Sequence, residues 1–348
     1  NLLVFSFQVK RIRRSLFSSE KTHALLQAYS AILLRIENTT YTSPLLKALQ
    51  QKLYAGNQKA GTLLQKLAAI YSGMETVQNP FAAVITNGLY LNHIHLLSRL
   101  IRWRRQYAAQ IPEWLEVIGA FEMLGSLANF HDNHPGFCFP RLNKEEMIRF
   151  KEMGHPLLSA AKRINNDACF DSYRFMILTG SNMSGKSTFL RTLGVNMILS
   201  GMGSVVCAVD ADVHPMPVFV SMRQSDSLAD SESYFFAEVK RLKYIMDQMD
   251  EGAVFVLLDE ILRGTNSDDK RSGTVGVIEK ISGKKVYGAI ATHDLEVCLT
   301  TDKYPGILSN KCFEVEIRND ELVFDYKLRE GICRNKSATF LMKKMKII

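Results

Sequence analysis

Residues 180–188 read Gly-Ser-Asn-Met-Ser-Gly-Lys-Ser-Thr, which fills the G-x-x-x-x-G-K-[ST] template of a Walker A phosphate-binding loop. An apolar strand pattern at 174–179 precedes the loop, and a helical pattern follows from 189. A chance match in a glycine-containing turn is the alternative, and this strand–loop–helix setting disfavours it. The sequence therefore predicts nucleotide-binding residues at Gly180, Ser181, Asn182, Met183, Ser184, Gly185, Lys186, Ser187 and Thr188.

The chemistry expected of this loop follows from its residue types. Glycines allow backbone N–H groups to turn toward phosphate, and the following helix presents its positive N-terminus. Lys186 adds a point charge at the β- and γ-phosphates, and the Ser187 hydroxyl is a ligand for Mg²⁺.

Polar residues follow two further apolar strand patterns, at 254–258 and 285–291. Asp259 ends the first and would hold Mg²⁺, since ligands of open α/β sheets bind at the carboxyl ends of strands. Glu260 is placed to act as general base on the attacking water. His293 follows the second strand and would contact the γ-phosphate. The alternatives are a strand ending in solvated acids and an ordinary strand-end histidine.

Four segments resemble the ATPase of the MutS mismatch-repair family, and they follow one another along the chain in the order found in that family. Residues 179–188 are similar to its T-G-x-N-M-x-G-K-S-T loop, 259–265 to its D-E-x-x-R-G-T stretch and 291–293 to its A-T-H strand end. Residues 225–238 resemble its S-D-x-L-x-x-x-x-S-x-F-x-x-E segment. The resemblance implies that Ser233 contacts the γ-phosphate held by the other subunit of a dimer.

The resemblance continues on both sides of these motifs. Residues 121–130 and 138–140 resemble the end of the family's helical core, 154–158 its H-P-[LV] entry to the ATPase, and 325–331 its Y-x-L-x-x-G strand. Residues 163–166 occupy the place of its adenine-side loop, which implies a nucleotide contact at Ile164.

The expected fold is α plus α/β. Residues 1–143 would form an all-helical core or lever domain, and residues 144–348 an ABC-like P-loop ATPase domain with a mostly parallel sheet.

The resemblance implies that the chain binds and hydrolyses ATP to ADP with Mg²⁺ in a head-to-tail homodimer formed through the ATPase domain. It also implies coupling to DNA binding in mismatch repair or a related repair or recombination process. The alternative is an ATP-gated protein scaffold, membrane-tethered in a longer parent protein. An ABC-transporter nucleotide domain is disfavoured, because no L-S-G-G-Q signature occurs.

Departures from the family pattern predict a divergent branch that lacks the mismatch-recognition domain. No Phe-x-Glu motif precedes residue 150. Ser231 stands where a glycine usually precedes the trans-acting serine, Ser181 follows Gly180 where proline is usual, and Asn266 replaces a serine or threonine.

Composition adds few constraints. The 348 residues suffice for about two domains, and the formal charge of +8 allows contact with phosphate backbones. Six dispersed cysteines with no C-x-x-C pair fit reduced thiols in a cytoplasmic protein. No run of 18 apolar residues occurs, so we expect no membrane contact of this chain.

The first residues leave two interpretations open. Since the chain begins at Asn1 and not at methionine, we expect it to belong to a longer protein. Residues 1–14 are then either a short strand or helix end, or the tail of an apolar segment with basic residues on the cytoplasmic side.

Apolar periodicity predicts helices at 20–37, 44–71 and about 81–109, and a fourth from Pro112 to about Phe130. Four arginines surround Trp103 within 98–105. This cluster is either a solvated face above a core tryptophan, which we favour, or a contact surface for a phosphate backbone.

Overall fold

The computed structural model describes residues 19–75, 92–222, 234–318, 321–333, 342, 345 and 347. The chain divides into two compact units, Asn1–Ala128 and Asn129–Ile348. The division falls within one helix, α7 (Ile111–Asp132). Each unit has its own hydrophobic core and is described by itself.

The described part of the first unit is helical apart from one short hairpin. Its α-helices are α2 (Ser19–Asn38), α3 (Pro44–Gln51), α4 (Ala60–Glu75), α6 (Asn92–Tyr107) and α7 as far as Ala128, and a 3-10 turn, η2 (Ala108–Gln110), precedes α7. Strands β1 (Tyr54–Ala55) and β2 (Gln58–Lys59) form the hairpin between α3 and α4. The prediction of one helix over 44–71 was therefore wrong. Gly56 has φ of +62°, a left-handed turn conformation that a continuous helix does not contain.

The core of this unit places both tryptophans of the chain inside. Trp103 and Trp114 are buried among leucines, and the indole N–H of Trp103 donates to the carbonyl of Leu63 at 3.0 Å. The four arginines around Trp103 are exposed. The core interpretation of Trp103 is confirmed.

The second unit is built on a mostly parallel sheet. Among the described residues, six strands take the order β12-β11-β6-β10-β9-β8, and β12 alone is antiparallel to its neighbour. The strands are β6 (Phe175–Gly180), β8 (Val218–Ser221), β9 (Val254–Asp259), β10 (Val286–Ala291), β11 (Leu308–Arg318) and β12 (Glu321–Glu330). Every residue of β6 and β10 is buried, as the continuous apolar patterns predict for strands covered on both faces.

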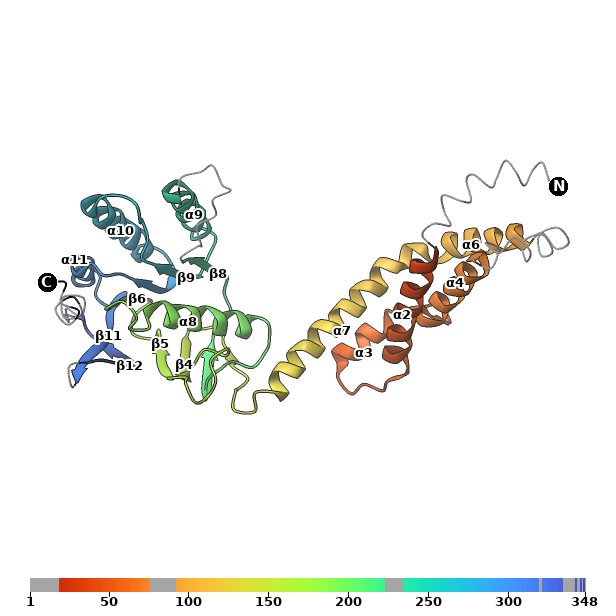
Figure 1. Ribbon diagram of the computed structural model, residues 1–348, viewed down its shortest axis with the longest axis horizontal. Coiled ribbons are helices and arrows are strands. Elements are labelled where there is room, and N and C mark those ends of the chain that lie inside the picture. Colours follow the sequence, from red (N-terminus) through yellow and green to blue (C-terminus); the bar gives the residue numbers. More distant parts are fainter. Residues whose placement is uncertain are drawn as a thin grey trace. The chain divides into compact units, whose positions relative to one another are not determined.

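Layers cover both faces of this sheet. On one face, α8 (Lys186–Gly201) and a second sheet enclose a core that includes Met176 and Leu178. On the other face, α9 (Tyr234–Gln248), α10 (Ser267–Ser282) and α11 (Leu295–Cys298) cover Phe175 and Ile177. Figure 1 shows α9 and α10 on one side of the sheet and α8 with β4 and β5 on the other.

The second sheet lies across α8 from the main one. In the described residues it has the order β3-β7-β4-β5, from β3 (Arg141–Leu142), β4 (Ile148–Met153), β5 (Asn166–Cys169) and β7 (Asp210–Val213). A short helix, α12 (Thr300–Lys303), precedes β11. None of the helices in the described ranges is long and apolar enough to cross a bilayer.

Candidate functional site

The predicted phosphate loop connects the end of β6 to the start of α8. Gly185 is the N-cap residue of α8 and has φ of +104°, where any side chain would be strained. A Cβ atom at Gly185 would also lie 3.1 Å from Cδ1 of Tyr326. Met183 adopts a left-handed φ of +67° at the tip of the loop and is exposed. The sequence thus folds locally into the tight strand–loop–helix turn that the motif predicts.

Lys186 turns back across this loop. Its side chain is buried, and Nζ donates to the carbonyl oxygens of Gly180 at 2.8 Å and Ser181 at 2.9 Å. The same nitrogen lies 3.4 Å from Nε2 of His293. An ammonium group in this position can also form charge-assisted hydrogen bonds to a phosphate. Lys186 therefore connects the phosphate loop with the end of β10.

Glu260 follows β9 and meets His293 across the sheet edge. The Glu260 backbone N–H donates to the carbonyl of Ala291 at 3.0 Å, which extends the β9–β10 ladder by one residue. Oε1 of Glu260 lies 2.7 Å from Nε2 of His293, and Oε2 pairs with the guanidinium of Arg263. Because Nε2 donates its hydrogen to Glu260, it has no lone pair for Lys186, and the 3.4 Å contact is proximity and not a hydrogen bond.

These contacts fix the ionisation of Glu260. The hydrogen bond from His293, with the charges of His293, Arg263 and Lys186, lowers the pKa of Glu260 from 4.5 to about 2, against the opposing effect of burial. The carboxylate is therefore ionised at neutral pH.

The turn that carries Glu260 has a strained backbone and is held by a hydrogen bond to α9. Glu260 has φ of +51° and Leu262 has φ of +59°, both left-handed values that cost non-glycine residues free energy. The Arg263 N–H donates at 3.1 Å to Oε2 of Glu238 on α9. Burial raises the pKa of that Glu238 carboxyl. The surrounding contacts, and not local preference, hold the turn in this shape.

Asp259 is the least satisfied polar group near the loop. It is 4% exposed, and within the described ranges neither carboxylate oxygen has a hydrogen-bond partner. A buried carboxylate without donors is costly, and a bound cation removes that cost. The hydroxyl oxygens of Ser181 and Ser184 are also buried without a partner there. An oxygen-lined position beside a phosphate loop fits Mg²⁺, which takes few protein ligands and retains water and phosphate oxygens.

A cavity of about 640 Å³ opens over the phosphate loop. Its lining combines loop residues with side chains from β12, from the segment before β5 and from the turn after β9. The predicted site residues in the lining are Ile164, Asn182, Met183, Ser184, Gly185, Lys186, Ser187, Thr188 and Glu260. Gly180, Ser181 and His293 are not in the lining but are joined to it through Lys186 and Glu260. Asp259 precedes Glu260, and Ser233 lies outside the described residues.

Several lining residues were not singled out from the sequence. They are Met153, His155, Leu158, Lys162, Asn166, Phe189, Thr192, Phe313 and Tyr326. Asn166 and Tyr326 do fall within the two segments that resemble the adenine-side loop and the Y-x-L-x-x-G strand. The signal was therefore present, but neither side chain was assigned a place in the site.

The chain matches known proteins over this same region. Residues 176–346 match the model of MutS domain V. The chain is 32% identical over 203 residues to MutS protein homolog 4 of Homo sapiens, a match that covers 55% of the chain and 22% of that protein. It is 30% identical over 233 residues to the DNA mismatch repair protein MutS of Ruminiclostridium cellulolyticum, covering 64% of the chain and 26% of that protein. The chain thus spans about a quarter of the length of these relatives.

Proposed function

Because this chain belongs to the MutS family, we propose that it is an ATPase whose second unit binds ATP with Mg²⁺ and hydrolyses it. The observation that carries the proposal is the meeting of Lys186, His293 and Glu260. Lys186 opens α8 at the end of the phosphate loop, and Glu260 and His293 follow β9 and β10. His293 lies 3.4 Å from Lys186 and 2.7 Å from Glu260, so it brings the three side chains together. A phosphate loop, an acid and a histidine at one sheet edge form the arrangement that phosphoryl transfer to water requires.

In this proposal each residue has a distinct task. Backbone N–H groups of residues 181–188 and the Lys186 ammonium bind the β- and γ-phosphates. Ser187 and Asp259 would hold Mg²⁺, which would supply positive charge to neutralise the phosphate oxygens. The half-exposed ring of Tyr326 and the side chain of Ile164 line the cavity and offer apolar surface to the adenine base.

Glu260 would act mainly by orientation. A carboxylate with a pKa of about 2 is a weak base, so complete proton removal before phosphoryl transfer is unfavourable. A loose transition state at phosphorus needs a positioned water more than a strongly deprotonated one. Glu260 would therefore accept a hydrogen bond from the attacking water and take its proton late. His293 would hold the carboxylate in place and, beside Lys186, would contact the γ-phosphate.

We further propose that two chains form a head-to-tail homodimer through residues 144–348, with Ser233 of each reaching the γ-phosphate in the other. Residues 1–143 would act as an arm coupled to DNA in repair or recombination. The names of the relatives, which include DNA mismatch repair proteins, support the DNA-repair part of this proposal.

The experiment that tests the hydrolytic core is phosphate release from ATP by wild type and by Glu260→Gln. We expect Mg²⁺-dependent release from wild type, and ATP binding without release from the variant. Absence of both ATP binding and release in the folded wild type would overturn the proposal. Filter binding with duplex, mismatched and branched DNA, with and without ATP, tests the coupled partner. A chain that binds ATP but none of these DNAs would favour the scaffold alternative.

A further inference from the structure

Strand β12 bulges where it passes the phosphate loop. Phe313 on β11 pairs with Leu328, but Val315 pairs with Phe324, so Glu314 alone faces residues 325–327. The middle residue of the bulge, Tyr326, has a left-handed φ of +55°. A bulge of this kind redirects a side chain and removes backbone groups from the ladder, and those groups need other partners.

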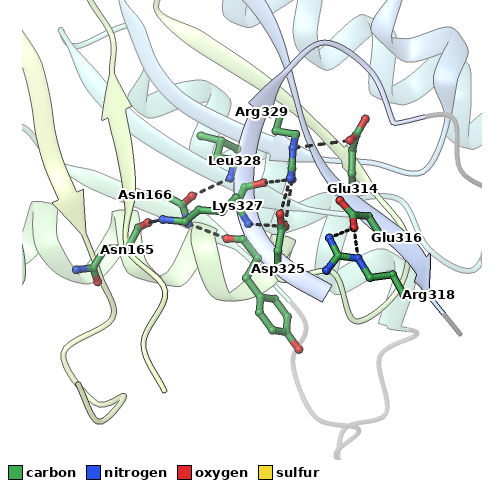
Figure 2. A network of polar contacts seen from close by, with 10 residues as sticks. Asn165, Asn166, Glu314, Glu316, Arg318, Asp325, Lys327, Leu328 and Arg329 are labelled. Carbon is green, nitrogen blue, oxygen red and sulfur yellow. Dashed lines mark hydrogen bonds and ion pairs between the residues drawn. The ribbon is translucent and has the colours of Figure 1, made fainter. Parts of the chain in front are cut away.

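Charged side chains of β11 and β12 form the first set of contacts that hold this bulge. Oδ1 of Asp325 accepts hydrogen bonds from the Lys327 N–H at 3.0 Å and from Nη1 of Arg329 at 3.1 Å. Nε of Arg329 also lies 3.7 Å from Oε2 of Glu314. The Arg329 guanidinium, helped by the Lys327 N–H, lowers the pKa of Asp325 and keeps this link ionised. Figure 2 shows Arg329 between Asp325 and Glu314.

Asn166 on β5, in the other sheet, provides the second set of contacts with a neutral side chain. Nδ2 of Asn166 donates to the carbonyl of Tyr326 at 2.9 Å, and Oδ1 of Asn166 accepts from the N–H of Leu328 at 2.7 Å. The amide thus supplies one acceptor and one donor, the same pair that a neighbouring strand would supply. In Figure 2, Asn166 reaches Leu328, and Lys327 reaches Asn165, whose carbonyl accepts from Nζ at 2.8 Å.

The geometry of the bulge determines where the Tyr326 ring lies. Tyr326 Cδ1 is the atom nearest to a Cβ built on Gly185, at 3.1 Å, so the ring lies on the last residue of the phosphate loop. The side chain is 43% exposed and lines the cavity. Because the Tyr326 carbonyl is held by Asn166, a change in that hydrogen bond shifts the ring relative to the loop.

We propose that Asn166 is a positioning residue for the nucleotide base, because it ties β5 to the β12 bulge and so fixes the Tyr326 ring beside the phosphate loop. The inference rests on the proposed function, since it assumes that the cavity binds a nucleotide. The phosphate groups would be held by residues 180–188 without help from Asn166. Loss of the Asn166 amide would therefore weaken binding of a ligand that has a base and spare a ligand that has only phosphates.

Calorimetric titration of the full 348-residue chain with ATP and with inorganic tripolyphosphate separates these two contributions. We expect Asn166→Leu to raise the Kd for ATP by about tenfold, or about 1.4 kcal/mol, as expected for loss of a base-stacking surface. The Kd for tripolyphosphate should not change. In ATP turnover, KM should rise while kcat at saturating ATP stays close to wild type. Asn165→Ala is the matched control, since its backbone carbonyl still accepts from Lys327, and it should change neither Kd.

A second variant guards against misfolding. Asn166→Asp keeps the acceptor for Leu328 but places an oxygen against the Tyr326 carbonyl, and it should reproduce the selective loss of ATP binding. A double variant with Tyr326→Ala should lose no more ATP affinity than Tyr326→Ala alone.

Three results would overturn the inference while leaving the proposed function intact. They are an equal loss for both ligands, no loss for either ligand, and the same loss in Asn165→Ala. A folded wild type that binds tripolyphosphate but not ATP, or neither ligand, would overturn the proposed function as well.

Discussion

Glu260 and His293 stand at the ends of neighbouring parallel strands, and 2.7 Å separates Oε1 of the one from Nε2 of the other. Their strands are paired in register up to Asp259 and Ala291, so the two side chains emerge at the same level of the sheet. The hydrogen bond gives His293 its tautomer and Glu260 its orientation. In the proposed function, this acid and this histidine, fixed beside a buried lysine, would receive a phosphate group and a water.

Replacement of Lys186 should remove nucleotide binding and turnover together. In Lys186→Ala the ammonium that lies against the loop carbonyls is lost, and with it a charge–phosphate contact in a partly desolvated site. We expect no measurable ATP hydrolysis and a strongly weakened Kd for ATP. Lys284→Ala, at a solvent-exposed lysine paired with Asp250, is the control. Normal turnover in purified Lys186→Ala would contradict the proposed active site.

Replacement of Glu260 should separate binding from hydrolysis. Glu260→Gln keeps the size of the side chain but cannot accept a proton from water, a role worth roughly 10²–10⁴-fold in rate. We expect ATP affinity near wild type and hydrolysis reduced by that factor, measured by phosphate release in a single turnover. Poor ATP binding by the variant would instead assign Glu260 a role in ordering the loop or the metal.

The same contacts make stability depend on acid pH. The pKa of Glu260 lies at about 2 in the folded chain and at 4.5 ordinarily, so the unfolded chain binds its proton first as the pH falls. The stabilisation from this carboxylate is therefore complete above pH 4.5 and is lost as the pH falls toward 2. Urea unfolding at several pH values should show a free-energy difference between wild type and Glu260→Gln that narrows over this window. A difference that stays constant from pH 5 to pH 2 would contradict the assignment.

Replacement of Ser233 distinguishes two roles for this residue, a contact in a site shared between subunits and a helix cap. It directly precedes α9 in the sequence, where a serine normally caps a helix and contributes about 1 kcal/mol. If it reaches the partner's γ-phosphate, Ser233→Ala should cut turnover strongly with little change in Tm. Mixed with Lys186→Ala, it should form heterodimers with one doubly defective site and one intact site, so activity should recover on mixing. If subunits exchange and activity does not return, the shared site is wrong.

The parts of the site that come from short motifs were predictable from the sequence. The phosphate loop and the strand ends at Asp259 and Ala291 depend on neighbours within a few residues, and they lie where the patterns indicated. Asn166 and Tyr326 meet across 160 positions through a bulge whose register no local pattern records. The hairpin that interrupts residues 44–71 was missed because helical periodicity on both sides outweighed one Gly56-Asn57 turn.

The burial of Trp103 and Trp114 has a practical consequence for studying communication within this chain. They are its two tryptophans, and both lie in the core of the N-terminal unit, whereas the phosphate loop belongs to the other unit. Tryptophan fluorescence, excited at the indole band, therefore reports on the helical unit alone. No added fluorophore is needed. A spectral shift on addition of ATP would show that occupancy of the pocket in one unit changes the surroundings of the tryptophans in the other, in the unmodified protein and in real time.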